Sequence, residues 1–288
     1  PDIIEGAHDW VGELASNGMA VKLSLPAPVK KQFLANDISA MTYQKNLYGL
    51  PLNHESIAFV QNTDMVGTKC FTTLTAAVAK ANTVNGLTTP IQVGPDAYHF
   101  YPMMTGLGGA FFKRNADGSY DPNSVQVDAR ALLKNAGIIE SWQASGLFKG
   151  TIHTKTCAFP TIVKGIKSYP FSGVRGLMIT KFANTHKVLP AAKAALISWF
   201  STSKVQTTFG SKNNVNPANV KSVNSNKFTN GFQITAPDAT PMPNIPEMAA
   251  VWGAVSDAWA KALKAVDPTA AKTAFLQGAS QIRDQISN

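Results

Sequence analysis

The sequence predicts a protein of the α/β class. Segments rich in β-branched and aromatic residues alternate along the chain with segments whose apolar residues recur at helical spacing. Apolar residues make up 44% of the 288 residues and charged residues 15%, which is the composition of a globular protein. A chain of this length forms either one large domain or two medium ones, and either arrangement buries a sizeable core.

The first half of the chain predicts strands, one hairpin and three helices. In order, these are a strand at Pro1–Ile4, a helix at Trp10–Asn17, a hairpin at Tyr43–Pro51, a strand at Ser56–Gln61, and helices at Leu74–Ala81 and Asp128–Ala136. The hairpin is predicted around a Lys45-Asn46 turn, and Asp128 is the expected N-cap of the last helix.

The second half predicts one strand and three helices. The strand is Gly173–Ile179, and Pro190 stands in the first turn of an Ala-rich helix that runs to Phe200. The Asn-, Ser- and Lys-rich stretch 210–230 is expected to be weakly structured. A helix with apolar residues at helical spacing follows Pro246, and Asp267-Pro268 begins the last helix.

The charge distribution argues against a nucleic-acid partner. The formal net charge is +9, but the lysines are scattered singly or in pairs, and arginine, the usual reader of bases and phosphates, occurs at only four positions. No apolar run approaches the roughly 20 residues that a membrane-spanning helix needs.

The sequence predicts no catalytic residue, metal site or cofactor. None of the five histidines has the spacing of a metal motif, no glycine-rich stretch carries the Lys-Ser/Thr of a phosphate loop, and no G-x-S-x-G elbow occurs. Cys70 and Cys157 are far apart and form no C-x-x-C motif, which argues against metal or redox chemistry. They are either buried thiols or one disulfide.

Aromatic and acidic residues occur together in the pattern that sugar binding requires. A pyranose stacks its apolar face on an aromatic ring, and its hydroxyls need polar or charged partners. Such combinations occur at His8-Asp9-Trp10, around Glu55, and at Asp96–Tyr101. Two of these patterns have a second interpretation, because Trp10 and the pair Tyr98 and Tyr101 are also compatible with core packing. For Trp259 core packing is expected, whereas Trp252, near the helix start, is the better candidate for a binding role.

At these residues the chain resembles the maltose/maltodextrin-binding family of ABC-importer solute-binding proteins. The resemblance is spread over the chain. It includes Pro1–Ile4 with Ala7–Asp9, Tyr48–Pro51 with Glu55, Asn62–Met65, Asp96–Tyr101, Gly108–Phe111, Gly173–Thr180, and Met242–Met248 followed by Trp252. The Met242–Met248 stretch, MPNIPEM, is the most specific of these matches.

The resemblance implies a type II-like periplasmic-binding fold of two α/β lobes joined by hinge strands. Lobe one is expected to comprise 1–55 plus 176–218, and lobe two 56–175 plus 219–288. The family further implies roles for seven residues. Hydroxyl binding falls to Asp9, Glu55 and Asp96, stacking or wall roles fall to Tyr98, Tyr101 and Trp252, and Met242 is expected near the sugar. Trp10 stands where some family members carry an Arg, and its indole is expected to offer the sugar a stacking surface.

The function that the resemblance implies is transport. The protein is expected to bind a maltose, maltodextrin or cyclodextrin-type oligosaccharide between its lobes and to deliver it, as a monomer, to ABC importer membrane subunits. It is expected outside the cytoplasm, in the periplasm or as a cell-surface lipoprotein, with its export signal outside this sequence. A secreted glycoside hydrolase and a non-transport sugar-binding fragment or sensor module remain alternatives.

Two family features have no counterpart in the printed sequence. Family members open with a strand–helix–strand unit before the Pro-Asp-Ile strand, and they carry a segment ending in Gly-Pro-Trp after the position of Gly146–Gly150. We therefore expect parts of the polypeptide to be missing from this sequence, and exposed sheet edges in the first lobe if it is complete.

Overall fold

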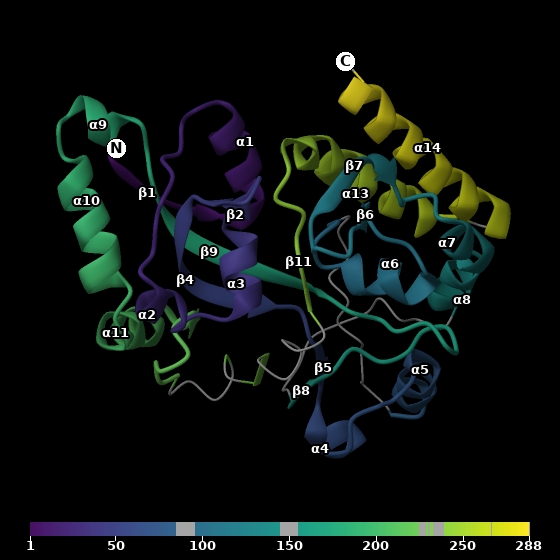
Figure 1. Cartoon of the computed structure of the whole chain (residues 1–288). Coiled ribbons are helices and arrows are strands. Elements are labelled where there is room, and N and C mark those ends of the chain that lie inside the picture. The colour runs from purple at the N-terminus through teal and green to yellow at the C-terminus, as the bar shows by residue number, and fades with distance from the viewer. Residues whose placement is uncertain are drawn as a thin grey trace. The chain divides into compact units, whose positions relative to one another are not determined.

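The computed structural model shows two compact units, each built from several stretches of the chain (Figure 1). The described residues are 1–84, 96–144, 155–224, 229, 231–232, 239–265 and 267–287. The first unit comprises Pro1–Ser56, Asp117–Tyr120 and Ser172–Met248, and the second comprises Ile57–Ala116, Asp121–Phe171 and Ala249–Asn288. The range 219–248 was expected in lobe two but belongs to the first unit. The reason is strand pairing, because Asn216–Pro217, just before this range, and Thr240–Pro241, within it, both join the sheet of the first unit.

The first unit is organised around one sheet. Its strands are β1 (Ile3–Ala7), β4 (Gly49–Ser56), β9 (Phe171–Ile179), β10 (Asn216–Pro217) and β11 (Thr240–Pro241). The strand order is β1-β9-β4-β10, and β11 also pairs with β9. The β1–β9, β9–β4 and β4–β10 pairs are antiparallel. β9 therefore lies between β1 and β4 and connects most of the unit.

Helices and a short hairpin surround this sheet. They are η1 (His8–Trp10), α1 (Val11–Ser16), α2 (Ala27–Lys30), α3 (Ala35–Ala40), β2 (Thr42–Tyr43), β3 (Asn46–Leu47), α9 (Phe182–Thr185), α10 (Leu189–Ala195), the π-helix η2 (Leu196–Phe200), α11 (Ser203–Asn213) and η4 (Pro246–Ala250). The predicted helices after Trp10 and around Pro190 are confirmed.

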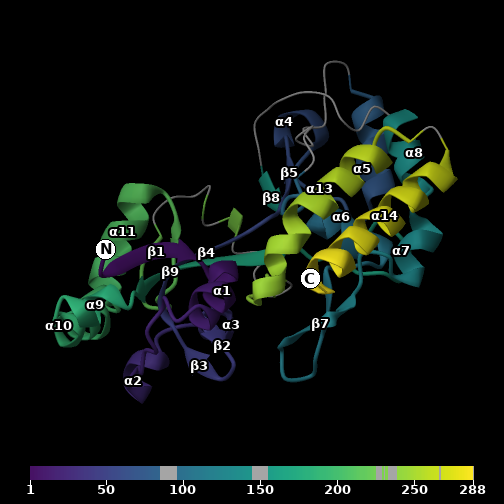
Figure 2. The same ribbon diagram turned by 90° about the horizontal axis from the view of Figure 1, so that it is seen from above.

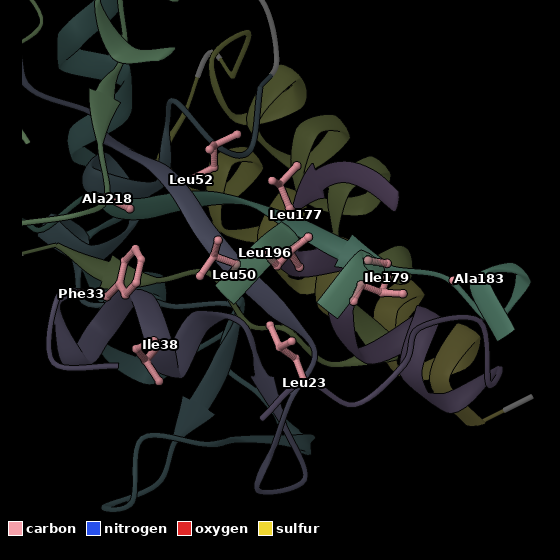
Figure 3. Close-up of a cluster of buried hydrophobic side chains, with 11 residues drawn as sticks. Leu23, Phe33, Ile38, Leu50, Leu52, Leu177, Ile179, Ala183, Leu196 and Ala218 are labelled. Atoms are coloured by element: carbon pink, nitrogen blue, oxygen red, sulfur yellow. The ribbon is translucent and has the colours of Figure 1, made fainter. Parts of the chain in front are cut away.

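Both faces of β9 are buried. Successive side chains of a strand point to opposite faces, and neighbouring residues of β9 belong to different apolar clusters. Leu177 and Ile179 belong to one apolar cluster together with Leu50 of β4 and Leu196 of η2 (Figure 3). Met178 belongs to a second cluster, which includes residues of α1 and α3. A strand covered on both faces reads as a nearly continuous apolar run, which is why this segment was recognisable in the sequence.

The second unit consists mainly of helices with two small two-stranded sheets. Its elements are β5 (Phe59–Gln61), α4 (Thr63–Val66), α5 (Leu74–Asn82), α6 (Tyr101–Leu107), β6 (Phe112–Arg114), β7 (Tyr120–Val125), α7 (Arg130–Asn135), α8 (Ile138–Ala144), β8 (Lys155–Cys157), α13 (Val251–Ala262) and α14 (Pro268–Ser287). β5 pairs with β8 and β6 with β7. Helices α13 and α14 pack along each other (Figures 1 and 2).

Trp259 and one of the two cysteines, Cys157, are completely buried in the second unit. Trp259 is fully buried and contacts Phe275 of α14 edge-on, with ring centroids 5.1 Å apart, so its predicted core role is confirmed. Cys70 and Cys157 form a disulfide, which decides between the two alternatives left open by the sequence. In the part of the chain that the structure describes, no helix is both long enough and apolar enough to cross a bilayer.

The hairpin and the following strand differ from the sequence prediction. The turn is Gln44-Lys45 rather than Lys45-Asn46, and both turn residues have positive φ angles (46° and 65°), as the tight turn of a two-residue hairpin requires. The predicted strand Ser56–Gln61 is split, because β4 ends at Ser56 and β5 begins at Phe59.

Asp128 and the Asn-rich stretch also differ. The N-cap of α7 is Ala129, and Asp128 instead accepts a hydrogen bond from Arg283 of α14 at 2.7 Å. The start of the stretch 210–230 is helical, since α11 continues to Asn213, and β10 then joins the sheet. Part of this stretch, and the predicted junction at Gly146–Gly150, lie outside the described residues.

Candidate functional site

Strand β9 brings two candidate segments of the first unit together. β1 ends opposite Arg175 of β9, and the Asp9-Trp10 pair follows two residues later. Glu55 on β4 lies opposite Gly173 of the same strand. Positions 173 and 175 are two residues apart, so two segments separated by more than forty residues of sequence meet at one short stretch of β9.

Trp10 is an exposed aromatic residue and not a core residue. Its side chain is 49% exposed. The ring packs over Gly6 of β1, where an added Cβ would lie 2.7 Å from ring carbon Cε3. One part of the indole therefore rests on the main chain, and about half of it stays accessible for stacking on the apolar face of a sugar.

Glu55 is exposed, and its neighbour His54 contacts the buried carboxylate of Asp37. Asp37 of α3 is 1% exposed, and its Oδ2 lies 3.3 Å from Nδ1 of His54, the neighbour of Glu55. These three residues line a pocket of about 20 Å³ together with residues that include Asn216 of β10 and Ser172 of β9. A volume of this size accommodates about one water molecule or one hydroxyl group.

Met242 lies in a segment, Pro241–Asn244, that is tied to the first unit at several points. The side-chain amide of Asn244 donates to the carbonyl oxygens of Ala40 at 2.8 Å and Thr42 at 2.6 Å. A Cβ added at Gly12 of α1 would lie 2.3 Å from the carbonyl oxygen of Asn244. The Met242 segment therefore packs directly against the main chain of α1.

His8 links the Met242 segment to β9. The imidazole is completely buried. Nε2 lies 3.1 Å from the carbonyl oxygen of Met242, and Nδ1 lies 3.1 Å from the main-chain N of Val174. Burial lowers the pKa of His8 to about 4, although its two main-chain hydrogen bonds act in the opposite direction. The ring is therefore neutral at physiological pH.

In the second unit, Asp96 organises its own turn. Its Oδ1 accepts hydrogen bonds from the main-chain N–H groups of Tyr98 at 2.8 Å and His99 at 3.3 Å, and its Oδ2 contacts Nδ1 of His99. Partial burial by itself raises the pKa of Asp96, but the hydrogen bonds and the charge of His99 outweigh it and lower the pKa. Asp96 is therefore a charged acceptor, and each carboxylate oxygen offers two lone pairs.

The aromatic candidates of the second unit belong to one ring cluster. Tyr101 stacks on Phe171 with centroids 3.4 Å apart, and Tyr98 lies over the same ring at 6.1 Å. Phe111 contacts both Tyr101 at 5.0 Å and Trp252 at 5.8 Å. Tyr101 is 3% exposed, so it is a core residue of the cluster, whereas Tyr98 and Trp252 are only partly buried.

The structure thus places four predicted contacts in each unit: Asp9, Trp10, Glu55 and Met242 in the first, and Asp96, Tyr98, Tyr101 and Trp252 in the second. Sequence reasoning missed the roles of His8, Asn244 and Phe171. The first two lie inside the quoted motifs, so their positions carried a signal, whereas Phe171 is one apolar residue among many. Among the described residues, no group of three His, Cys, Asp or Glu side chains is arranged to hold a metal ion.

The chain has the fold of a solved solute-binding protein. The extracellular solute-binding protein of Staphylococcus aureus, solved with maltose, superposes over 100% of this chain and 84% of its own, with a TM-score of 0.82 and 22% sequence identity. The predicted α/β fold, the two-lobed fold of the solute-binding proteins, is thereby confirmed.

The family model for bacterial extracellular solute-binding proteins matches residues 1–275, and the chain belongs to this family. The maltodextrin-binding protein of Bacillus subtilis is 25% identical over 88% of this chain and 70% of its own length. A maltooligosaccharide ABC transporter solute-binding lipoprotein of Streptococcus pneumoniae is 23% identical over 88% of this chain and 69% of its own length. The family's location is extracellular, as the sequence predicted.

Proposed function

We propose that this protein binds an α-glucan oligosaccharide of the maltodextrin type and passes it to an ABC importer. The observation that carries the proposal is the arrangement at β9, where the half-exposed indole of Trp10 and the carboxylates of Asp9 and Glu55 come from segments that meet at the same strand. This combination of an open ring and nearby charged acceptors matches the two surfaces of a pyranose.

The second unit supplies the same two kinds of group. Tyr98 and Trp252 form the accessible part of the aromatic cluster, and Asp96 is a charged acceptor bonded to the main-chain N–H of Tyr98. We propose that both units contribute to one ligand and that ligand binding closes them by a hinge movement. The closed form is the one that the importer recognises.

The relatives support the choice of ligand and of partner. Their names specify maltodextrin and maltooligosaccharide, the solved neighbour holds maltose, and one relative is named as part of an ABC transporter. These relatives are binding proteins. We propose that this chain likewise performs no chemical step, so its carboxylates act as hydrogen-bond acceptors and not as an acid and a nucleophile.

Isothermal titration tests the ligand class. We expect heat of binding with maltose, maltotriose and a cyclodextrin, and none with the β-linked cellotriose. The same samples are assayed for released reducing sugar, which the proposal predicts to be absent. Lack of heat with all three α-glucans, for protein that shows a cooperative unfolding transition, would exclude the α-glucan assignment.

Two variants test the residues that carry the proposal. Removing the ring in Trp10→Ala is expected to weaken maltotriose binding by up to about tenfold, because a stacking contact of this kind contributes roughly 0.5–1.5 kcal/mol. Glu55→Gln is expected to weaken it by a similar factor, because it replaces a charged acceptor with a neutral one. The matched controls are Trp199→Ala, which removes an indole that is 57% exposed elsewhere in the same unit, and Glu13→Gln, which neutralises an exposed carboxylate of α1. Equal losses in variants and controls would contradict the assignment.

A further inference from the structure

His8 occupies a junction between three segments of the first unit. The last β1 residue paired with β9 is Ala7, opposite Arg175, and the His8 ring then takes the place next to Val174. Its other nitrogen reaches Met242, directly after β11. The contact partners are distant in the sequence: Val174 lies 166 residues after His8, and Met242 lies 234 residues after it.

The hydrogen-bond partners favour one tautomer of the neutral ring. Nε2 faces the carbonyl oxygen of Met242, whereas Nδ1 faces both the main-chain N, at 3.1 Å, and the carbonyl oxygen, at 3.2 Å, of Val174. A hydrogen on Nε2 allows two hydrogen bonds, one donated to Met242 and one accepted from the N–H of Val174, whereas a hydrogen on Nδ1 allows only the bond to the Val174 carbonyl oxygen. Both nitrogens are then used, and each has a fixed direction.

The cost of burying this ring indicates a positional role. A completely buried imidazole must be desolvated, and an apolar side chain of similar volume would fill the space without that penalty. No apolar residue, however, supplies a donor toward Met242 and an acceptor toward Val174 at opposite ends of one rigid ring. The position therefore requires a group that fixes two main-chain atoms at a set spacing.

We propose that His8 is the positioning residue of the sugar site in the first unit. Asp9 and Trp10 follow His8 directly in the chain, so fixing the ring fixes where their side chains start. The same ring fixes the main chain of Met242. Through one neutral imidazole, the carboxylate, the indole and the thioether are held at a constant spacing along β9. This inference rests on the function proposed above.

Three substitutions at His8 separate positioning from simple packing. His8→Phe keeps the volume and removes both polar contacts. His8→Gln keeps a donor near the position of Nε2, and His8→Asn keeps a polar group near Nδ1. We expect His8→Phe to weaken maltotriose binding at least tenfold in titrations at pH 7, and His8→Gln to recover part of that loss. The control is Leu196→Ala, which destabilises the same unit from a different apolar cluster.

The affinities are compared only among variants that urea unfolding shows to be folded at the titration temperature. If Leu196→Ala binds like the wild type while His8→Phe loses affinity, the effect comes from the position of the contacts. If His8→Phe also binds like the wild type, His8 only supports packing and the inference is wrong. Should His8→Phe fail to fold, the order of affinities wild type, then His8→Gln, then His8→Asn is the decisive result, and equal affinities for all three would overturn the proposal.

Amide hydrogen exchange provides a readout that does not depend on a sugar. We expect faster exchange in His8→Phe than in Leu196→Ala for peptides covering Ser172–Gly176 and 239–245. Unchanged exchange in both peptides would contradict the proposed role even if the wild-type protein bound no maltodextrin. A wild type without sugar binding, combined with the expected exchange, would instead refute the proposed ligand and leave the junction at His8 established.

Discussion

At the scale of single residues, the Met242 segment is held by close main-chain contacts and by side chains that each have a defined task. Asn244 satisfies the carbonyl groups at the end of α3, the hydroxyl of Tyr120 donates to the carbonyl of Pro241, and His8 bonds Met242. The MPNIPEM stretch therefore has a structural reason for its sequence in addition to any contact with a ligand.

Gly12→Ala tests the close approach of α1 to this segment. The added methyl group would lie 2.3 Å from the carbonyl oxygen of Asn244, a main-chain atom that cannot simply move away. We expect a loss of about 1–3 kcal/mol in the free energy of unfolding, measured by urea denaturation. Gly253→Ala in α13 is the matched control, because nothing lies within 4 Å of its added Cβ. There alanine should stabilise the helix by up to about 1 kcal/mol. A neutral Gly12→Ala would show that the segment does not pack as described.

The buried neutral imidazole of His8 predicts a specific pH dependence of stability. The folded protein binds the His8 proton only near pH 4, whereas the unfolded chain binds it near pH 6.5. The stabilisation is therefore complete above pH 6.5, and it is lost as the pH falls through this window toward 4, by about 3 kcal/mol in total. Urea unfolding at several pH values should show a smaller decrease for His8→Gln than for the wild type. Parallel curves for the two proteins would contradict a neutral buried ring.

At the scale of elements, the two-stranded β5–β8 sheet depends on a covalent link. Cys157 lies at the end of β8 opposite Phe59 of β5, and its disulfide to Cys70 closes back to the segment after α4. A sheet of two strands has little stability of its own in water. The disulfide is therefore expected to be the main constraint on this part of the second unit.

Replacing both cysteines with serine is expected to lower the free energy of unfolding by about 2–4 kcal/mol. Dithiothreitol should lower the urea midpoint of the wild type in the same way and leave the double variant unchanged, which controls for other effects of the reductant. A wild-type midpoint that does not respond to the reductant would show that the link contributes no stability.

The elements that sequence reasoning located correctly are those whose signals are local. The start of α14 is an example, because Asp267 accepts the main-chain N–H of Ala270 at 2.8 Å, as an N-cap does. Asp128 carried the same signal, but a residue 155 positions away competes for its carboxylate. Likewise, Asp9, Trp10 and Glu55 were recognisable as candidates one by one. Their meeting at β9 was not, because it depends on strand pairing between distant segments.

At the scale of the whole molecule, the chain combines two discontinuous units, each with its own set of carboxylate and aromatic side chains. Hydroxyl groups project from both edges of a sugar chain, so both sets have groups to bind on one ligand. The central claim of our account is that the two sets act on one ligand.

Hydrogen exchange with and without saturating maltotriose tests this claim most directly. We predict slower exchange on ligand addition in peptides from both units, around Asp9 and Glu55 in the first and around Tyr98 and Trp252 in the second, while α14 away from the candidate residues stays unchanged. Protection confined to a single unit, in a sample where titration shows the sugar to be bound, would contradict it.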